Sequence, residues 1–248
     1  MASTAIAETF DMGRVLSRAF GAIGRNAALF IGLAAILSGI PQLIAGLWRV
    51  DVGGPEFAGP SVIAAVVGGL LAWVGSAVLQ VAITRATISD LVGERPGFAG
   101  CLKAGFAMLL PMIGLTILMG LGIAFGFMLL FVPGVMLYVA WSVAVPAYVQ
   151  ERVGVVESFG RSRALTKGSR WKIFGLLLVC WIVILVLQAP AGLLNAAAQT
   201  PTTLSVLITT AVGVVTTMVL CTVQAAIYVE LRDVKEGAAP SDLETIFA

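Results

Sequence analysis

The 248-residue sequence contains no histidine, and charged residues make up only 11% of it. Histidine is the commonest general base near neutral pH and the commonest metal ligand, so its absence argues against most acid–base and metal-dependent enzymes. Because 59% of the residues are hydrophobic, the chain also lacks the polar side chains that coat a soluble globule. These absences predict a non-enzymatic membrane protein with no metal and no cofactor.

Other chemical signatures are also scarce. The three cysteines are too few and too scattered for a disulfide framework, so free thiols are expected. No glycine-rich phosphate loop, HExxH or CxxC motif occurs. The acidic residues closest to the apolar runs are expected to cap helices or pair with arginines; they are Asp90, Glu94, Glu151 and Glu157.

What the sequence does contain is long uncharged runs, at residues 26–48, 57–84, 104–150 and 173–229. A helix needs about 20 residues to cross the hydrocarbon core, so the first two runs predict one span each and the last two predict hairpins. Pro133 and Gly134 mark the turn of the first hairpin, and a polar run around Pro201 marks the second. The predicted spans are 27–48, 61–84, 105–131, 133–149, 173–195 and 203–228.

The basic residues predict the orientation. Fourteen of the 15 lysines and arginines fall in segments on one side of the predicted spans, and Arg49 alone falls on the other. The positive-inside rule therefore predicts that both termini are cytoplasmic. Because the N-terminal segment carries acids and widely spread arginines, unlike a signal peptide, the first span is expected to be an uncleaved anchor. The positive charge reflects topology, and no nucleic-acid partner is expected.

Short segments before the odd-numbered spans share a design. Residues 8–26 place Val15, Leu16, Ala19, Phe20 and Ile23 on one helical face, which is typical of an interfacial amphipathic helix. Residues 155–167 repeat this with Val155, Val156, Phe159 and Leu165, and residues 97–107 do so with Phe98, Leu102 and Phe106. The pattern predicts an all-α polytopic protein of three pseudo-repeated units, each an amphipathic surface helix plus a transmembrane hairpin. Residues 1–26 would form the N-terminal amphipathic helix, 27–230 a six-helix membrane bundle and 231–248 a cytoplasmic tail.

The basic segment 161–172 allows two interpretations. Lysines and arginines beside an anionic leaflet gain about 1 kcal/mol each, which favours plain topology and anchoring, whereas a specific headgroup or partner site is the functional alternative. Anionic lipids of the cytoplasmic leaflet are the expected partners, with a second copy or another membrane protein kept open. The candidate headgroup ligands are Arg161, Arg163, Lys167, Arg170, Lys172, Arg14, Arg18 and Arg25.

Residues 131–178 resemble the YciC-like proteins and the related membrane domain of some glycerophosphodiester phosphodiesterases. The shared features are a Pro-Gly helix start, a later proline, an acidic exit, a surface helix with Arg-Ser, and Thr-x-Gly before a basic entry. They correspond here to Pro133, Gly134, Pro146, Glu151, Gly154, Glu157, Arg161, Ser162, Thr166 and Gly168. The resemblance implies a bacterial inner-membrane protein linked to envelope and lipid homeostasis, and it implies no mechanism.

A transporter is the alternative function. No charged residue lies at the centre of a predicted span, which argues against ion coupling, but intramembrane Gln, Ser and Thr could line a narrow polar path or hydrogen-bond between packed helices. Pro41, Pro111 and Pro190 are expected to kink the first helix of each hairpin. Gly122 and Gly126 form a close-contact pair, within one bundle or between two chains.

Overall fold

The structure, a computed structural model, describes residues 10–51, 59–198 and 202–237. Within these residues almost every position is helical and no strand occurs, so the all-α prediction is confirmed. The helices of the described part, including one π-helix (η1), are α1 (Met12–Arg25), α2 (Ala27–Ala34), η1 (Ala35–Gly39), α3 (Ile40–Asp51), α4 (Gly59–Leu91), α5 (Phe98–Ala107), α6 (Leu109–Leu129), α7 (Phe131–Ala140), α8 (Ala144–Glu151), α9 (Val155–Thr166), α10 (Arg170–Ala198) and α11 (Thr203–Glu236).

Six stretches of helix in the described residues are long and apolar enough to cross a membrane, which identifies a multi-pass membrane protein. They are Ala27–Leu47, Val66–Leu91, Leu109–Leu129, Phe131–Glu151, Arg170–Leu194 and Thr203–Glu236. The number and order of the predicted spans are confirmed. Two predicted ends fall well short of the helices: α4 continues to Leu91, past the predicted end at residue 84, and α11 continues without a break to Glu236. The tail predicted from residue 231 therefore begins inside a helix.

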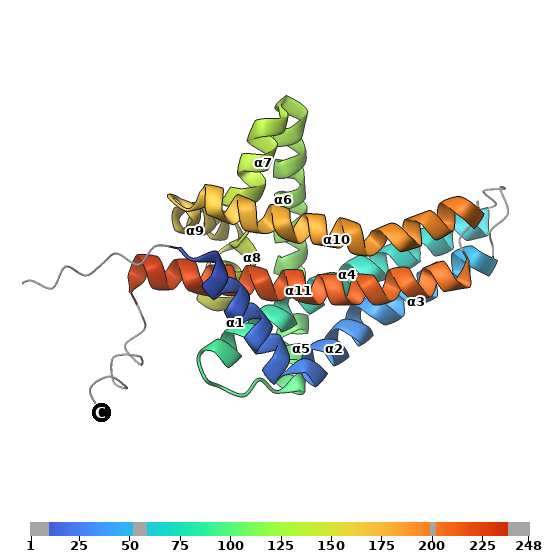
Figure 1. Cartoon of the computed structure of the whole chain (residues 1–248), viewed down its shortest axis with the longest axis horizontal. Helices are drawn as coiled ribbons and strands as arrows, with labels where there is room; N and C mark the ends of the chain where they lie inside the picture. Colours follow the sequence, from blue (N-terminus) through green and yellow to red (C-terminus); the bar gives the residue numbers. More distant parts are fainter. Residues whose placement is uncertain (1–9, 52–58, 199–201, 238–248) are drawn as a thin grey trace, which may run out of the picture.

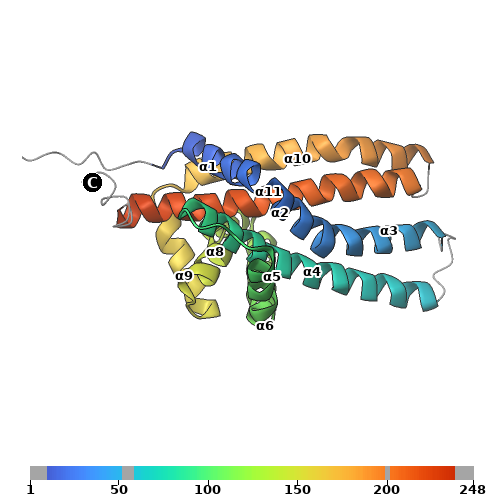
Figure 2. The ribbon, with the colours of Figure 1, turned by 90° about the horizontal axis from the view of Figure 1, so that it is seen from below.

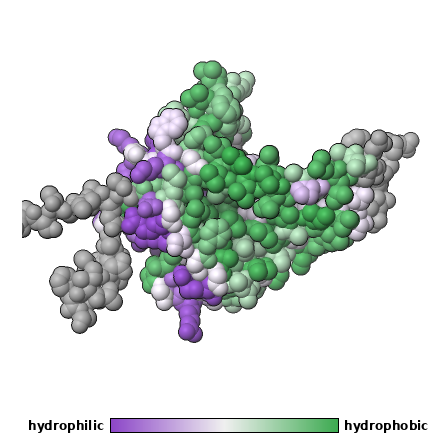
Figure 3. All heavy atoms as spheres, in the orientation of Figure 1, coloured by the Kyte–Doolittle hydropathy of each residue, from purple (hydrophilic) through white to green (hydrophobic). Residues whose placement is uncertain are grey.

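The six apolar stretches do not form one parallel bundle. Helices α4, α10 and α11 and the α2–α3 segment run along the long axis of the molecule, whereas α6 and α7 stand across it as a hairpin (Figure 1). Seen from below, the four long segments lie side by side, with α5, α6 and α9 displaced to one side (Figure 2). Hydrophobic residues cover both the long helices and the hairpin (Figure 3). The α6–α7 hairpin is therefore an apolar arm, an arrangement that a simple six-helix bundle over residues 27–230 does not include.

Glycines let the two helices of the arm pack closely. A Cβ on Gly122 would lie 2.5 Å from Cη2 of Trp141, and a Cβ on Gly126 would lie 3.0 Å from the Cα of Gly134. A Cβ on Gly134 would meet the ring of Phe127 at 2.5 Å. The predicted Gly122 and Gly126 pair thus makes its close contact inside the hairpin of one chain. Pro133 lies in the first turn of α7, so the turn predicted here is confirmed, with Leu130 between the two helices.

The first span is interrupted by π-helix η1, directly before Pro41. Pro41 has no N–H, so the Leu37 carbonyl lacks its usual donor four residues on. This carbonyl lies against Gly75 of α4, where a Cβ would overlap the Leu37 oxygen. The wider π turn, together with a glycine on the neighbouring helix, accommodates the proline inside an apolar span.

The other two prolines predicted to kink spans occupy different positions in their helices. Pro190 does lie inside α10, as predicted. Pro111 lies in the first turn of α6, because α5 ends at Ala107 and a separate helix begins at Leu109. A proline in a first turn removes no intrahelical hydrogen bond, so the prediction of a kink at Pro111 is wrong.

The fourth span is broken, where the sequence predicted one helix over 133–149. Helix α7 ends at Ala140, and α8 starts at Ala144 with Pro146 in its first turn. The hydroxyl of Ser162 in α9 donates to the Ala140 carbonyl at 2.7 Å, and the Thr166 hydroxyl lies 3.4 Å from the same oxygen. Helix α9 therefore supplies the hydrogen bonds that the broken span needs at its centre.

The buried face of α9 therefore differs from the apolar face that the sequence predicts. Its buried residues are Ser158, Ser162, Leu165 and Thr166, whereas Val156, predicted on the apolar face, is 75% exposed. Helix α1 fits the prediction better, because Val15 and Ala19 are buried and α1 packs on α11. Its Phe20 nevertheless remains 56% exposed. Leu165, Val15 and Ala19 belong to the apolar core that also contains Tyr228 of α11.

We expect Gly122→Ala to destabilise the hairpin and Gly120→Ala, on the same helix, to leave it intact. The added methyl group at Gly122 overlaps the Trp141 indole, which costs about 1–3 kcal/mol as overpacking. A Cβ on Gly120 has nothing within 4 Å, and alanine is the better helix former. Thermal unfolding in mild detergent, followed by circular dichroism, gives the comparison. Equal midpoints for the two variants would contradict the packing described here.

Candidate functional site

Charged and polar residues gather at one end of the molecule, over α1, α9 and the end of α11 (Figure 3). This region, from Tyr228 of α11 together with α1 and α9, is called the ionic end below. Its centre is Glu230, whose side chain is only 1% exposed. A buried carboxylate needs cationic or hydrogen-bonding partners to remain ionised.

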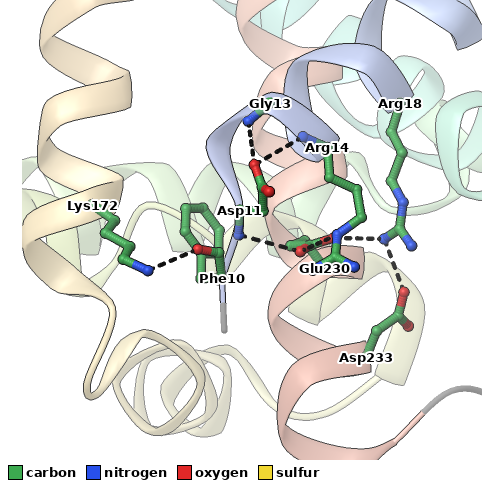
Figure 4. A network of polar contacts seen from close by, with 8 residues as sticks. All are labelled: Phe10, Asp11, Gly13, Arg14, Arg18, Lys172, Glu230 and Asp233. Atoms are coloured by element: carbon green, nitrogen blue, oxygen red, sulfur yellow. Dashed lines mark hydrogen bonds and ion pairs between the residues drawn. The ribbon is translucent and has the colours of Figure 1, made fainter. Parts of the chain in front are cut away.

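Two arginines of α1 supply those partners (Figure 4). Arg14 Nε donates to Glu230 Oε1 at 2.8 Å, and Arg18 Nη1 lies 3.1 Å from Glu230 Oε2. Arg18 also pairs with Asp233 at 2.8 Å. The α1 helix is positioned by its N-cap, since Asp11 Oδ1 accepts from the backbone N–H of Gly13 at 2.7 Å. These contacts hold the first described helix against the last.

A second network joins α8, α9 and α11. Arg161 Nε donates to both carboxylate oxygens of Glu151 at 2.8 Å, and its Nη2 pairs with Glu236. The Tyr228 hydroxyl donates to Glu151 Oε1 at 2.9 Å. Burial lowers the pKa of the Arg161 guanidinium, but its hydrogen bonds to Glu236 and Glu151 outweigh burial and raise the pKa above its ordinary value. Arg161 is therefore a permanently charged link between three helices.

Two further cations are engaged within the chain. Arg25 pairs with Asp90 at the end of α4, with Nη2 and Oδ2 2.5 Å apart. Lys172 Nζ donates to the Phe10 carbonyl at 3.0 Å, as Figure 4 shows. The expectation that boundary carboxylates cap helices or pair with arginine is confirmed at Asp90, at Glu151 and at Glu157, which accepts from the Gly154 N–H.

The eight predicted headgroup ligands therefore do not form one site. Arg14, Arg18, Arg25 and Arg161 neutralise carboxylates of the same chain, and Lys172 binds a backbone carbonyl. Arg163 and Lys167 are exposed. Arg170, the first residue of α10, is half-buried, and its Nε is buried without a hydrogen-bond partner among the described residues.

Arg170 lies at a groove between the arm and the bundle. The groove has a volume of about 300 Å³ and is almost entirely apolar; its lining is Phe131, Val132, Val135, Met136 and Val139 of α7 with Arg170, Trp171 and Phe174 of α10. Trp171 is 85% exposed and packs edge-on against Phe174. The groove thus combines an apolar channel with one guanidinium, next to an indole of the kind that favours the headgroup region. This combination suits a ligand with an anionic head and a hydrocarbon chain.

Sequence reasoning missed the acidic partners of the arginines. Glu230, Asp233 and Glu236 are three residues apart, which places them on neighbouring positions of a helix, and this spacing was a usable signal. Because residues from 231 onward are predicted to form a cytoplasmic tail, Asp233 and Glu236 are not expected to lie on a helix. The buried small polar face of α9 gave no comparable signal, because serine and threonine also occur on exposed faces.

Nothing in the described residues assembles a metal site, since no group of three or more Cys, Asp or Glu side chains is positioned to hold an ion. All three cysteines are free thiols, as predicted. Burial raises the pKa of the Cys101 thiol in α5, which makes it a poor nucleophile at neutral pH.

A protein-family model described as a domain of unknown function, DUF7847, matches residues 10–231. No curated protein and no solved structure matches the chain. The resemblance of residues 131–178 to YciC-like proteins stays a prediction.

We expect Glu230→Gln to loosen α1. The amide removes one negative charge that faces Arg14 and Arg18, at a cost of about 1–3 kcal/mol; this is below the figure for fully buried pairs because both guanidiniums are about a third exposed. Hydrogen–deuterium exchange of α1 should accelerate, while Glu94→Gln, at an exposed carboxylate in the α4–α5 loop, should leave it unchanged. Unchanged exchange of α1 in Glu230→Gln would show that the network does not anchor the helix.

Proposed function

This chain belongs to the DUF7847 family, whose description assigns no activity, and we propose that it is a non-enzymatic membrane module that binds an anionic lipid in the groove between α7 and α10. The observation that carries the proposal is the buried, unpartnered Nε of Arg170 beside an apolar groove. A buried donor of a charged group is costly to leave without an acceptor, and a phosphate oxygen is a strong one.

The geometry supports a lipid more than a soluble anion. The groove residues of α7 are all aliphatic or aromatic, so they offer nothing to a polar ligand and can bury an acyl chain. Other arginines at this end are already neutralised inside the chain, since Arg14, Arg18 and Arg161 each pair with carboxylates. Arg170 is therefore the cation that a headgroup in the groove would meet.

The orientation and the repeat are part of the proposal. The positive-inside rule places the ionic end and both termini in the cytoplasm, which would set Arg170 at the cytoplasmic leaflet. The order of elements, with α1, α5 and α9 each preceding a pair of apolar helices, supports three pseudo-repeated units. On this view the protein resides in a bacterial inner membrane and acts in lipid or envelope homeostasis.

The alternative, a transporter with a polar path, has less support. Most intramembrane hydroxyls bond within their own helices: Thr116 donates to the Met112 carbonyl, and Thr217 donates to that of Gly213. Gln188 lies exposed on α10, and Gln80 lies 3.4 Å from Gln224. These residues hold helices together or face outward instead of following one another across the membrane.

Lipid retention tests the proposal. We expect native mass spectrometry to show dioleoyl phosphatidic acid bound to the wild type and phosphatidylcholine released. Arg170→Gln should weaken binding about tenfold or more, since a hydrogen bond to a charged group contributes about 1.5–3 kcal/mol. Val132→Trp should also weaken it by filling the groove.

Arg163→Gln is the matched control, because Arg163 is an exposed arginine of α9 outside the groove. It should retain phosphatidic acid as the wild type does. Equal retention by Arg170→Gln and Arg163→Gln, or loss in both, would refute a site at Arg170 and leave the basic segment as an anchor.

A further inference from the structure

A second cavity lies in the half of the molecule away from the ionic end, between α3, α4 and α11. Its volume is about 300 Å³, which corresponds to about ten liquid waters. Unlike the groove at Arg170, it has a mixed polar and apolar lining, and none of its described lining residues is charged: Gln42, Ala45, Gly46, Gly68, Gly69, Ala72, Ser205, Val206, Thr209 and Thr210.

The small residues explain why the cavity exists. A Cβ on Gly69 would have no neighbouring atom within 4 Å, so there is open space beside α4 at this residue. At the preceding residue of α4, a Cβ on Gly68 would lie 3.3 Å from Ala45, and on α3 a Cβ on Gly46 would lie 2.5 Å from Val206. Helix α3 thus contacts both neighbours at glycines and leaves the space at Gly69 unfilled.

Two oxygens of the cavity lining can accept hydrogen bonds. The Thr209 hydroxyl donates its proton to the Ser205 carbonyl at 2.7 Å, and the Ser205 hydroxyl donates to the Thr202 carbonyl at 2.8 Å. Gln42 Nε2 donates one of its two N–H groups to the buried Ser38 hydroxyl of the π-helix. Lone pairs of Thr209 Oγ1 and Gln42 Oε1 remain available as acceptors.

The cavity is closed toward the ionic end. Between the cavity and the ionic end, residues of α2, η1, α4 and α11 form a buried apolar cluster that includes Leu33, Leu37, Leu79 and Met218. Gly39 packs against Val214, and Gly213 packs against Gln42, where Cβ positions would lie 3.0 Å from the neighbouring side chains. The polar residues therefore line a pocket that ends inside the membrane, which suits binding better than passage.

We infer that this cavity binds an uncharged ligand carrying hydroxyl groups, such as the glycerol head of a neutral lipid or a free polyol. Hydroxyls can donate to Thr209 Oγ1 and Gln42 Oε1, and the described lining residues carry no charge that would balance an ionic head. The site is separate from the groove at Arg170 in both position and chemistry.

Native mass spectrometry with dioleoylglycerol tests the inference, with free glycerol and the O-methyl ether of the same lipid as comparison probes. The wild type should retain dioleoylglycerol and bind the ether several-fold more weakly, because the ether has no O–H donor. Retention of free glycerol as strong as that of the lipid would identify a soluble polyol as the ligand. Failure to bind either hydroxyl-bearing probe would overturn the inference.

Two variants locate the binding. Gly69→Leu fills the hollow without a backbone clash and should weaken binding about tenfold or more. Thr209→Val removes one acceptor at nearly constant shape and should weaken it about fivefold, as expected for one hydrogen bond. Gly120→Leu, at another open glycine of an apolar helix, is the control and should bind normally.

Equal binding by Gly69→Leu and Gly120→Leu would overturn the inference. Phosphatidic acid, whose three glycerol oxygens are all esterified, is measured in the same samples. If Gly69→Leu still retains phosphatidic acid, a loss of dioleoylglycerol reflects this cavity and not the site at Arg170.

Discussion

The fold depends on the rule that a polar group inside a bilayer must find its partner within the protein, because no water is available there. Most intramembrane hydroxyls of the described residues follow the rule by bonding to carbonyls of their own helices, as Thr217 does to Gly213. At the ionic end, the buried Glu230 meets the same requirement by pairing with Arg14 and Arg18 from the other end of the chain. The same requirement therefore determines local helix geometry and the long-range contact between α1 and α11.

The same rule applies to the backbone carbonyls that lose their hydrogen bonds where helices break. The freed Leu37 carbonyl at Pro41 is accommodated by a π turn and by Gly75, and the end of α7 at Ala140 is bonded by Ser162. Among the described residues, four buried side-chain atoms still lack a hydrogen-bond partner: Trp141 Nε1, Arg170 Nε, Thr216 Oγ1 and Glu230 Oε2. Of these four residues, Arg170 lines the apolar groove, and the cavity at Thr209 adds a hydroxyl oxygen whose own proton is already donated. We regard these two places as ligand sites for that reason. One suits an anionic head, and the other suits a neutral hydroxyl-bearing head.

The number of spans was predictable from sequence because a run such as 173–229 admits only a few crossings of fixed length. The ion pairs between side chains were less predictable. Arg161 is predicted to bind a lipid headgroup because lysines and arginines beside a membrane usually do so. Its partners in the structure, Glu151 and Glu236, lie 10 and 75 residues away in the sequence. The arm at α6–α7 was not predicted, since uniformly apolar helices carry no periodic face that says what they pack against. Gly122 and Gly126 indicated a close contact but not its partner. Arg170 was correctly named as a candidate, although only the structure separates it from the paired arginines.

We propose that a lipid supplies the missing hydrogen-bond acceptor at Arg170 Nε. A cryo-electron microscopy map of the protein in nanodiscs containing phosphatidic acid tests it most directly. The account predicts density for one lipid, with its phosphate within hydrogen-bonding distance of Arg170 Nε and one acyl chain along Val132, Val135 and Val139 of α7. An empty groove, or a groove closed by the arm with Arg170 paired to a carboxylate of the chain, would contradict it.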